Sequence, residues 1–152
     1  MPDTADHNPT DHGDTAWVVH PTTAIRTDPQ PTVRVPAEWW YDPLDPAAVA
    51  LAFHPGTDNE TVWQFARSVL ADGLTPGAPI DPHADIRVWP VCINYLAVLL
   101  DAPAGSACFD VPILHADDFL AATYAAVPPH HEAAILDAAV TTAIGVLLTD
   151  TP

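Results

Sequence analysis

The segment SACFDVPILHADDFLAATYAAV, residues 106–127, decides the fold, because the periodicity of its apolar residues changes at Pro112. Residues 106–111 are typical of a short strand. Beyond Pro112, apolar residues recur at spacings of three and four, which predicts a helix over 115–127. Asp117 and Asp118 fall in its expected first turn, where the helix dipole favours negative charge.

Upstream of this segment, short apolar runs rich in β-branched and aromatic residues are separated by Pro, Gly and Asp. In residues 61–66 the side chains alternate as in a half-buried strand. Residues 101–106, DAPAGS, are short enough to close a hairpin. Residues 74–84 contain three prolines and are predicted to form a surface loop. The predicted strands are residues 15–20, 32–41, 47–54, 61–66, 85–90, 91–100 and 106–111.

Downstream, residues 131–148 predict a second helix with a wide apolar stripe. Such a stripe must be covered on more than one side, by the sheet and by another subunit. Strands followed by helices indicate an α+β fold, with a mostly antiparallel sheet and two C-terminal helices. Residues 1–15 are polar and acidic and are expected to be a disordered tail, with the domain spanning 16–150.

The charge excludes several classes of partner. The 152 residues contain 20 Asp and Glu, four Arg and no Lys, giving a formal net charge of −16. The mean field therefore repels nucleic acid and anionic lipid. No apolar run approaches the roughly 20 residues of a membrane span, and the first residues do not resemble a secretory signal. We expect a cytoplasmic protein in which Cys92 and Cys108 are buried, reduced thiols.

Candidate catalytic and metal-binding groups are sparse. His130, His131 and Glu132 are adjacent, and His115 lies two residues before Asp117, but neither set has the HExxH spacing of a zinc site. Neither a G-x-S-x-G nucleophile elbow nor a phosphate-binding glycine loop occurs. We therefore expect no catalytic residues, no metal and no cofactor.

Five blocks of residues, in order, resemble the SsgA-like proteins, which are sporulation and cell-division regulators of filamentous actinobacteria. The resemblance covers about residues 16–150. The blocks are Tyr41-Asp42-x-x-Asp45-Pro46-x-Ala48-Val49, Phe53-His54-x-Gly56, Trp63-x-Phe65-Ala66-Arg67-x-x-Leu70-x-x-Gly73-Leu74, Asp85-x-Arg87-Val88-Trp89-Pro90 and Ala126-Val127-Pro128-Pro129-x-x-Glu132.

The resemblance implies a partial barrel similar to the "whirly" single-stranded nucleic-acid-binding proteins, assembled as a trimer. It also implies a non-enzymatic role at division septa, in recruiting the tubulin-like division GTPase, directly or through a paralogue, or in steering cell-wall remodelling. Three features depart from the family pattern and bear on the choice of partner: the hairpin after Pro90 is shorter and more apolar, Trp39 and Trp40 precede Tyr41, and the acidic tail is extra.

Arg67 and Arg87 are half of the cations and fall within the resembling blocks. We expect both to form structural ion pairs, with Asp85, Asp72 and Glu60 as candidate partners and with Arg87 lying along an indole. The alternative is a remnant nucleic-acid groove in which tryptophans stack on bases. Single-strand binders combine stacking with a positively charged channel, which four cations among twenty acids do not readily supply.

Trp39, Trp40 and Tyr41 are candidate partner-binding residues. Consecutive strand residues point to opposite faces, so one of the two indoles is expected to face outward, where aromatic residues are enriched at interfaces. Burial under a loop or across a subunit boundary is the alternative. The run 91–100, if it were an uncovered edge strand, would favour aggregation.

From these observations we expect a cytoplasmic, homo-oligomeric adaptor, a dimer or trimer, that presents an acidic, aromatic surface to division or cell-wall-synthesis proteins. A whirly-like module that binds single-stranded nucleic acid is the alternative from another class.

Overall fold

The structure is a computed structural model, and it describes residues 16–132. One seven-stranded sheet, in the order β4-β3-β2-β1-β7-β6-β5, has antiparallel pairing throughout. The elements in chain order are β1 (Val18–Asp28), β2 (Val33–Tyr41), β3 (Ala48–Phe53), β4 (Thr61–Ala66), α1 (Arg67–Gly73), β5 (Ile86–Pro90), β6 (Tyr95–Ala102), β7 (Gly105–Pro112) and α2 (Ile113–Ala126).

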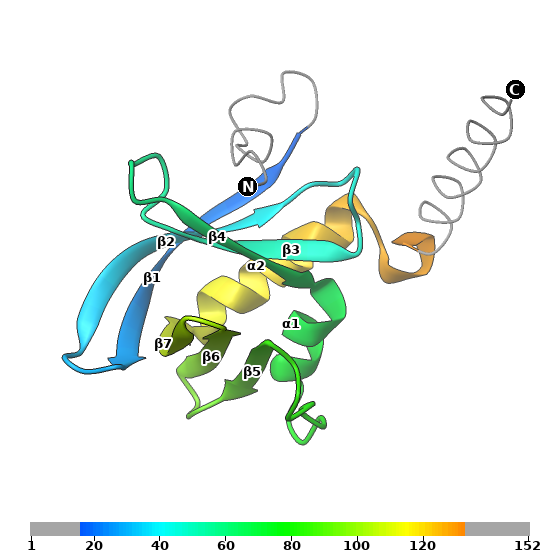
Figure 1. Cartoon of the computed structure of the whole chain (residues 1–152). Helices are drawn as coiled ribbons and strands as arrows, with labels where there is room; N and C mark the ends of the chain where they lie inside the picture. Colours follow the sequence, from blue (N-terminus) through cyan, green and yellow to red (C-terminus); the bar gives the residue numbers. More distant parts are fainter. Residues whose placement is uncertain (1–15, 133–152) are drawn as a thin grey trace, which may run out of the picture.

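The sheet curls into a half-barrel, and α2 lies within the curl, between the β1–β4 part and the β5–β7 part (Figure 1). One apolar core fills the concave side and includes residues of both parts of the sheet and of both helices. Trp39 of β2 stacks on Phe119 of α2 with 5.5 Å between ring centroids. This contact fixes α2 against the centre of the sheet.

The predicted α+β class, with an antiparallel partial barrel preceding helix, is confirmed. Pro103 and Ala104 join β6 to β7 in the hairpin expected from residues 101–106, with Ala102 opposite Gly105. Residues 74–85 are loop, as the prolines predicted. The tail, residues 1–15, and all but the first two residues of the second predicted helix, 131–148, lie outside the described residues.

The predicted start of α2 was wrong by two residues. The helix begins at Ile113, directly after β7, and its first turn contains no acidic residue. Asp117 and Asp118 therefore lie in the second turn, where they complement the helix dipole less. The spacing of the buried residues Phe119, Leu120, Thr123 and Val127 is the one expected from the sequence.

The apolar run 91–100 is not one strand. Val91–Asn94 form the turn between β5 and β6, in which the Val91 amide donates to the Tyr95 carbonyl at 2.9 Å. β6 is an inner strand paired with β5 and β7, so it is not an uncovered edge that would favour aggregation. Cys92 is exposed in this turn, which corrects its expected burial, while Cys108 is half-buried in β7. Burial raises the pKa of the Cys108 thiol.

The helix α1 packs against β5 through a close approach at Gly73. A Cβ atom at this position would lie 2.4 Å from Cγ1 of Val88, a separation that requires the neighbouring strand to move. Glycine therefore permits this packing. Within residues 16–132 neither helix has the length and apolar content needed to cross a membrane.

Candidate partner-binding surface

The turn between β5 and β6 lies beside the beginning of α2 and the end of α1, and together they form an apolar surface. The Ile113 amide donates to the Asn94 carbonyl at 2.9 Å, which ties the turn to the helix. A cavity of about 380 Å³ lies between them. We call this region the turn surface and define it by Leu74, Pro76, Pro90, Val91, Cys92, Ile93, Ile113 and the neighbouring Leu114.

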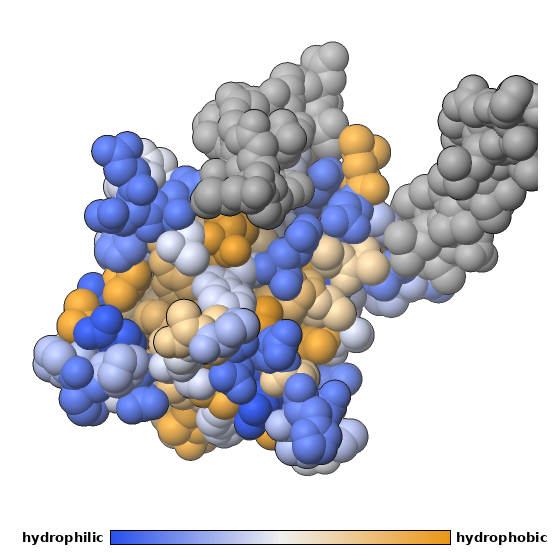
Figure 2. Space-filling model, viewed as in Figure 1, coloured by the Kyte–Doolittle hydropathy of each residue, from blue (hydrophilic) through white to orange (hydrophobic). Residues whose placement is uncertain are grey.

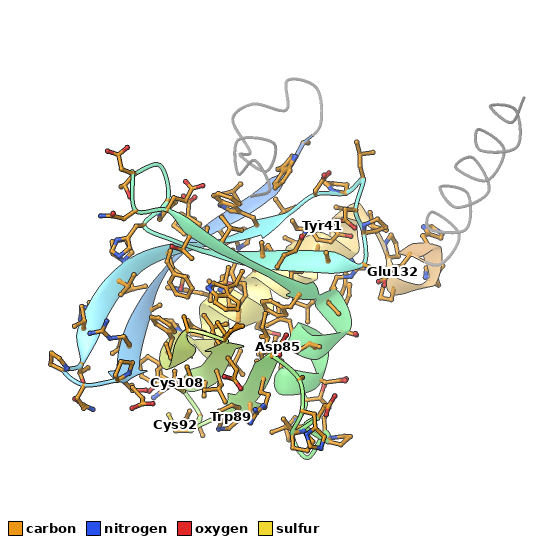
Figure 3. The ribbon with its side chains drawn as sticks, in the orientation of Figure 1. Tyr41, Asp85, Trp89, Cys92, Cys108 and Glu132 are labelled. Atoms are coloured by element: carbon orange, nitrogen blue, oxygen red, sulfur yellow. The ribbon has the colours of Figure 1, made fainter. Side chains whose placement is uncertain are left out.

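Large apolar side chains of the turn surface are exposed to solvent. Ile93 is 91% exposed, Leu114 74% and Val91 54%; the other large exposed hydrophobic residues in the described chain are Val33, Leu44 and Ile80. Figure 2 shows apolar residues reaching the lower edge of the molecule, in the region where Figure 3 labels Cys92. Exposed apolar residues that gather in one place, rather than singly, are typical of protein interaction sites.

The charged residues close along the chain to this surface are mostly acidic, and the one arginine among them, Arg87, precedes Pro90 by three residues and lies beside Asp101. Asp72 precedes Gly73 in α1, and Asp117 and Asp118 lie one turn beyond Leu114 in α2. Arg26 and Arg34 are at the β1–β2 hairpin instead, where Ile25 is paired with Arg34. The turn surface therefore combines apolar contact area with negative charge, a combination complementary to an apolar segment flanked by basic residues.

All three aromatic residues proposed for partner binding are buried. Trp39 and Tyr41 are 0% and 1% exposed, and Trp40 is 2% exposed. Trp40 does point to the face opposite Trp39, but it is covered there in a small cluster with Trp17, whose ring is perpendicular to it at 6.4 Å. Its Nε1 donates to Oε1 of Glu38 at 2.9 Å. None of the three rings therefore offers a surface to a partner in this conformation.

Arg67 is the centre of a buried junction at the C-terminal end of α2. Its Nη1 donates to the carbonyls of Thr123 and Val127, at 3.2 and 2.8 Å. The Thr123 carbonyl also accepts the Val127 amide at 2.8 Å, so the guanidinium adds a second donor to the last turn of the helix. Its Nη2 contacts Oε2 of Glu132 at 2.8 Å. With 1% of its surface exposed, this guanidinium caps a helix and is inaccessible to a phosphate.

Two tyrosines enclose the Arg67 guanidinium. Its Cζ lies 5.2 Å from the ring centroid of Tyr41 and 4.9 Å from that of Tyr124. The Tyr41 hydroxyl donates to the Pro46 carbonyl at 3.1 Å. Burial raises the pKa of Tyr41 to about 12, although the nearby arginine opposes the shift. Figure 3 shows Tyr41 and Glu132 on the same side of the molecule, away from Cys92.

Arg87 is half-buried and its contacts are weaker. Its Nε donates to the Ala84 carbonyl at 3.1 Å, and its Nη2 lies 3.7 Å from Oδ2 of Asp101. The carboxylates that contact the two arginines are thus Glu132 and Asp101, whereas Asp85, Asp72 and Glu60 were the candidates from the sequence. The arginine that lies over aromatic rings is Arg67, not Arg87.

These positions bear on the nucleic-acid alternative. Arg67 is enclosed, Arg87 lies beside Asp101, and Arg26 and Arg34 are at a separate hairpin. A single-strand groove requires aligned cations with accessible aromatic rings. The four arginines form no such row. Arg67 and Arg87 lie in two separate environments, and Arg26 and Arg34 lie at the β1–β2 hairpin.

The histidines near the end of the described chain lie together without a ligand set. His130 and His131 have ring centroids 4.1 Å apart, and the neighbouring Glu132 contacts Arg67. Between residues 16 and 132 the structure brings together no group of three or more His, Cys, Asp or Glu side chains with the arrangement of a metal site.

Comparison with known proteins identifies the class. The solved structure of SsgB from Streptomyces coelicolor, described in connection with longitudinal cell division during sporulation, matches with a TM-score of 0.70 and 32% identity over 80% of this chain and 96% of the other. An SsgA-like sporulation-specific cell division protein from Thermobifida fusca matches with a TM-score of 0.72 and 27% identity, over 86% and 96%. The curled half-barrel is thus that of sporulation-specific cell division proteins.

Sequence comparison gives the family. The family model described as Streptomyces sporulation and cell division protein, SsgA, matches residues 35–132. SsgB of Salinispora tropica is 42% identical over 113 residues, covering 71% of this chain and 76% of the relative. SsgB of Frankia casuarinae is 36% identical over 108 residues, covering 69% and 73%. The chain belongs to the SsgA family, as the blocks of residues predicted, and its relatives are named for a role in cell division during sporulation.

Proposed function

We propose that this chain is a non-enzymatic adaptor in sporulation-specific cell division, which uses its turn surface to hold a division or cell-wall-synthesis protein at the septum. The observation that carries the proposal is the exposure of Val91 and Ile93 in an apolar turn, together with that of Leu114, which follows the cavity residue Ile113 along the chain. Members of the family are sporulation and cell-division proteins, which supports a partner from the division machinery. The mechanism is recruitment through binding, without a chemical step.

The acidic residues beside the turn surface support a partner with basic residues flanking its apolar contacts. Opposite charges at the rim increase the rate of association and discourage wrong partners, while the apolar centre supplies most of the affinity. The tubulin-like division GTPase, or a paralogue that binds it, belongs to the partner class that we propose. The wide apolar stripe that the sequence predicts for a helix over residues 131–148 supports a homo-oligomer, a dimer or trimer.

The proposal is tested by a pull-down from sporulating cells with the double variant Ile93→Ser/Leu114→Ser. Losing two exposed apolar anchors should reduce the recovery of a specific division or cell-wall-synthesis protein by about tenfold or more, since each buried anchor contributes on the order of 1 kcal/mol or more. Leu44→Ser/Ile80→Ser is the matched control, because Leu44 and Ile80 are also exposed but do not line the cavity of the turn surface.

The control variant should retain the partner at the native level. Equal recovery with both double variants would contradict the proposed surface, and recovery of no division or cell-wall protein by the native chain would contradict the adaptor role. Tight, salt-sensitive binding of single-stranded DNA by the purified chain would favour the nucleic-acid alternative instead.

A further inference from the structure

A second cavity, of about 240 Å³, opens at the end of the half-barrel that α2 does not close. We call it the mouth cavity. Its wall includes Phe53 at the end of β3, Trp63 in β4 and Phe109 in β7, and the Phe53 and Phe109 rings are 4.5 Å apart. Since these strands lie in different parts of the sheet, the cavity is formed inside the curl and is distinct from the turn surface.

The ionisable side chains around the mouth cavity differ from those of the rest of this acidic protein. The ionisable side chains in its wall are Arg26 and His54, and no carboxylate lines it. The chain as a whole carries 20 acidic residues and four arginines. A site that lacks acidic residues and contains a guanidinium is therefore a local exception to the negative field, and it favours an anionic ligand.

The hydrogen bonds of Arg26 are incomplete. Its Nη2 donates to the Pro31 carbonyl at 3.3 Å, whereas its Nε is shielded from solvent and lacks an acceptor among the described residues. No carboxylate of residues 16–132 lies within ion-pairing distance of it. A guanidinium in such surroundings gains from a carboxylate, which accepts two hydrogen bonds at once.

The size of the cavity limits the ligand. Sites for drug-sized molecules have volumes of roughly 300–1,000 Å³. At about 240 Å³ the mouth cavity fits one ring or one branched aliphatic group. Its aromatic wall, formed by Phe53, Trp63 and Phe109, favours edge-to-face or offset contacts with such a group.

We propose that the mouth cavity binds a small carboxylic acid that carries one aromatic or branched aliphatic group. The apolar group lies against the three rings, and the carboxylate accepts hydrogen bonds from Arg26 and His54. Ligand binding here is independent of partner binding at the turn surface, so the failure of either proposal leaves the other intact.

The test is a titration of the full chain with phenylacetate, followed by ¹H–¹⁵N correlation spectra. Saturable shifts confined to residues around the mouth cavity are expected. Phenylacetamide, which has the same ring but no charge, should bind about tenfold more weakly, because it lacks the charge-assisted contact. 4-Methylpentanoate should also bind, since a branched aliphatic group fits the same space.

Arg26→Gln should weaken phenylacetate binding by about tenfold, and Arg26→Lys, which keeps the charge but loses the paired donors, by less. Arg34→Gln is the matched control: it removes the same charge from the adjacent strand, and Arg34 does not line the cavity. Ala107→Met, which places a longer side chain in the cavity wall, should abolish binding.

Three results would overturn the proposal. They are no saturable binding of either acid, equal affinity for phenylacetate and phenylacetamide, and equal weakening by Arg26→Gln and Arg34→Gln. The dispersion of the amide signals in each spectrum shows whether a variant is folded, so a lost signal is not mistaken for lost binding.

Discussion

Arg67 and Arg26 are at opposite ends of the same half-barrel. In both, Nε is shielded from solvent and lacks an acceptor among the described residues, but the other contacts of the two guanidinium groups differ. Arg67 follows the last residue of β4, whereas the mouth cavity beside Arg26 includes Thr61, the first residue of that strand. Six residues of strand separate these ends by about 17 Å. Arg67 has a carboxylate, two carbonyls and two aromatic rings as neighbours; the described chain gives Arg26 one carbonyl.

The difference shows how a chain with few cations distributes them. The guanidinium of Arg67 connects β4, α2 and residue Glu132, so it acts as part of the fold. That of Arg26 lines a cavity and has no carboxylate within ion-pairing distance among residues 16–132, which leaves it available to a ligand. The two ends of the sheet therefore have separate roles: one is closed by internal contacts, and the other is open.

The largest expected change in the free energy of unfolding comes from substituting Arg67, at the closed end of the half-barrel. Arg67→Met should reduce the free energy of unfolding by about 3–5 kcal/mol, because it removes the contact to the Glu132 carboxylate and the side-chain donor to the Val127 and Thr123 carbonyls, of which Thr123 keeps the Val127 amide. Urea denaturation followed by tryptophan fluorescence measures this change. Arg67→Lys should lose less, since an ammonium group keeps the charge but not the forked geometry.

If Arg67→Met is too unstable to purify, the loss measured for Arg67→Lys still tests the junction. A loss below about 1 kcal/mol for both variants would mean that the contacts of Arg67 contribute no more than a surface ion pair. The contrast between the two ends of the half-barrel would then disappear.

The titration of Tyr41 is expected to have an intermediate effect on the free energy of unfolding. Its pKa is about 12 in the folded chain and about 10 when unfolded, so below pH 10 both states hold the phenol proton. Between pH 10 and 12 the unfolded state releases this proton first and is favoured. Stability should therefore fall through this range, by up to roughly 2.7 kcal/mol in all, at ~1.36 kcal/mol per pH unit.

Urea denaturation at pH 9, 10 and 11 measures this dependence, with Tyr41→Phe as the control that retains the ring. The native chain should lose stability more steeply than the control, since the other tyrosines titrate in both. Parallel curves for the two proteins would show that Tyr41 is not held neutral by burial.

The smallest effect is expected at the open end. Arg26→Met should change the free energy of unfolding by no more than about 0.5 kcal/mol, because no carboxylate loses its partner and a shielded, unpaired Nε is removed. The same urea denaturation provides the measurement. A loss comparable to that of Arg67→Met would indicate that Arg26 is also part of the fold.

The residue patterns were sufficient to predict the α+β class and most of its elements, whereas the partial barrel was predicted from the family resemblance. Alternation in residues 61–66 and the spacing of Phe119, Leu120, Thr123 and Val127 depend on local backbone geometry, which the sequence specifies directly. The turn residues between β6 and β7 were equally informative. The five blocks of residues also identified the family before any comparison.

The candidate surface was missed because hydrophobicity does not reveal exposure. Val91, Cys92 and Ile93 continue the composition of β6 and were read as its first residues, although they form an exposed turn. The signal that was available is the shorter and more apolar hairpin after Pro90, by which the sequence departs from the pattern that the family resemblance implies. An exposed apolar turn of this kind indicates a contact surface.

By itself the sequence determined the order of strands and helix, the negative field and the family, because these follow from local periodicity, composition and residue identity. The tertiary structure alone decided that Trp39 and Trp40 are covered on both faces of the sheet, that Arg67 contacts Glu132, 65 residues away, and that Arg26 faces a cavity. Alternation specifies the face to which a side chain points. What covers that face, or leaves it open, depends on segments distant in the chain that packing brings together.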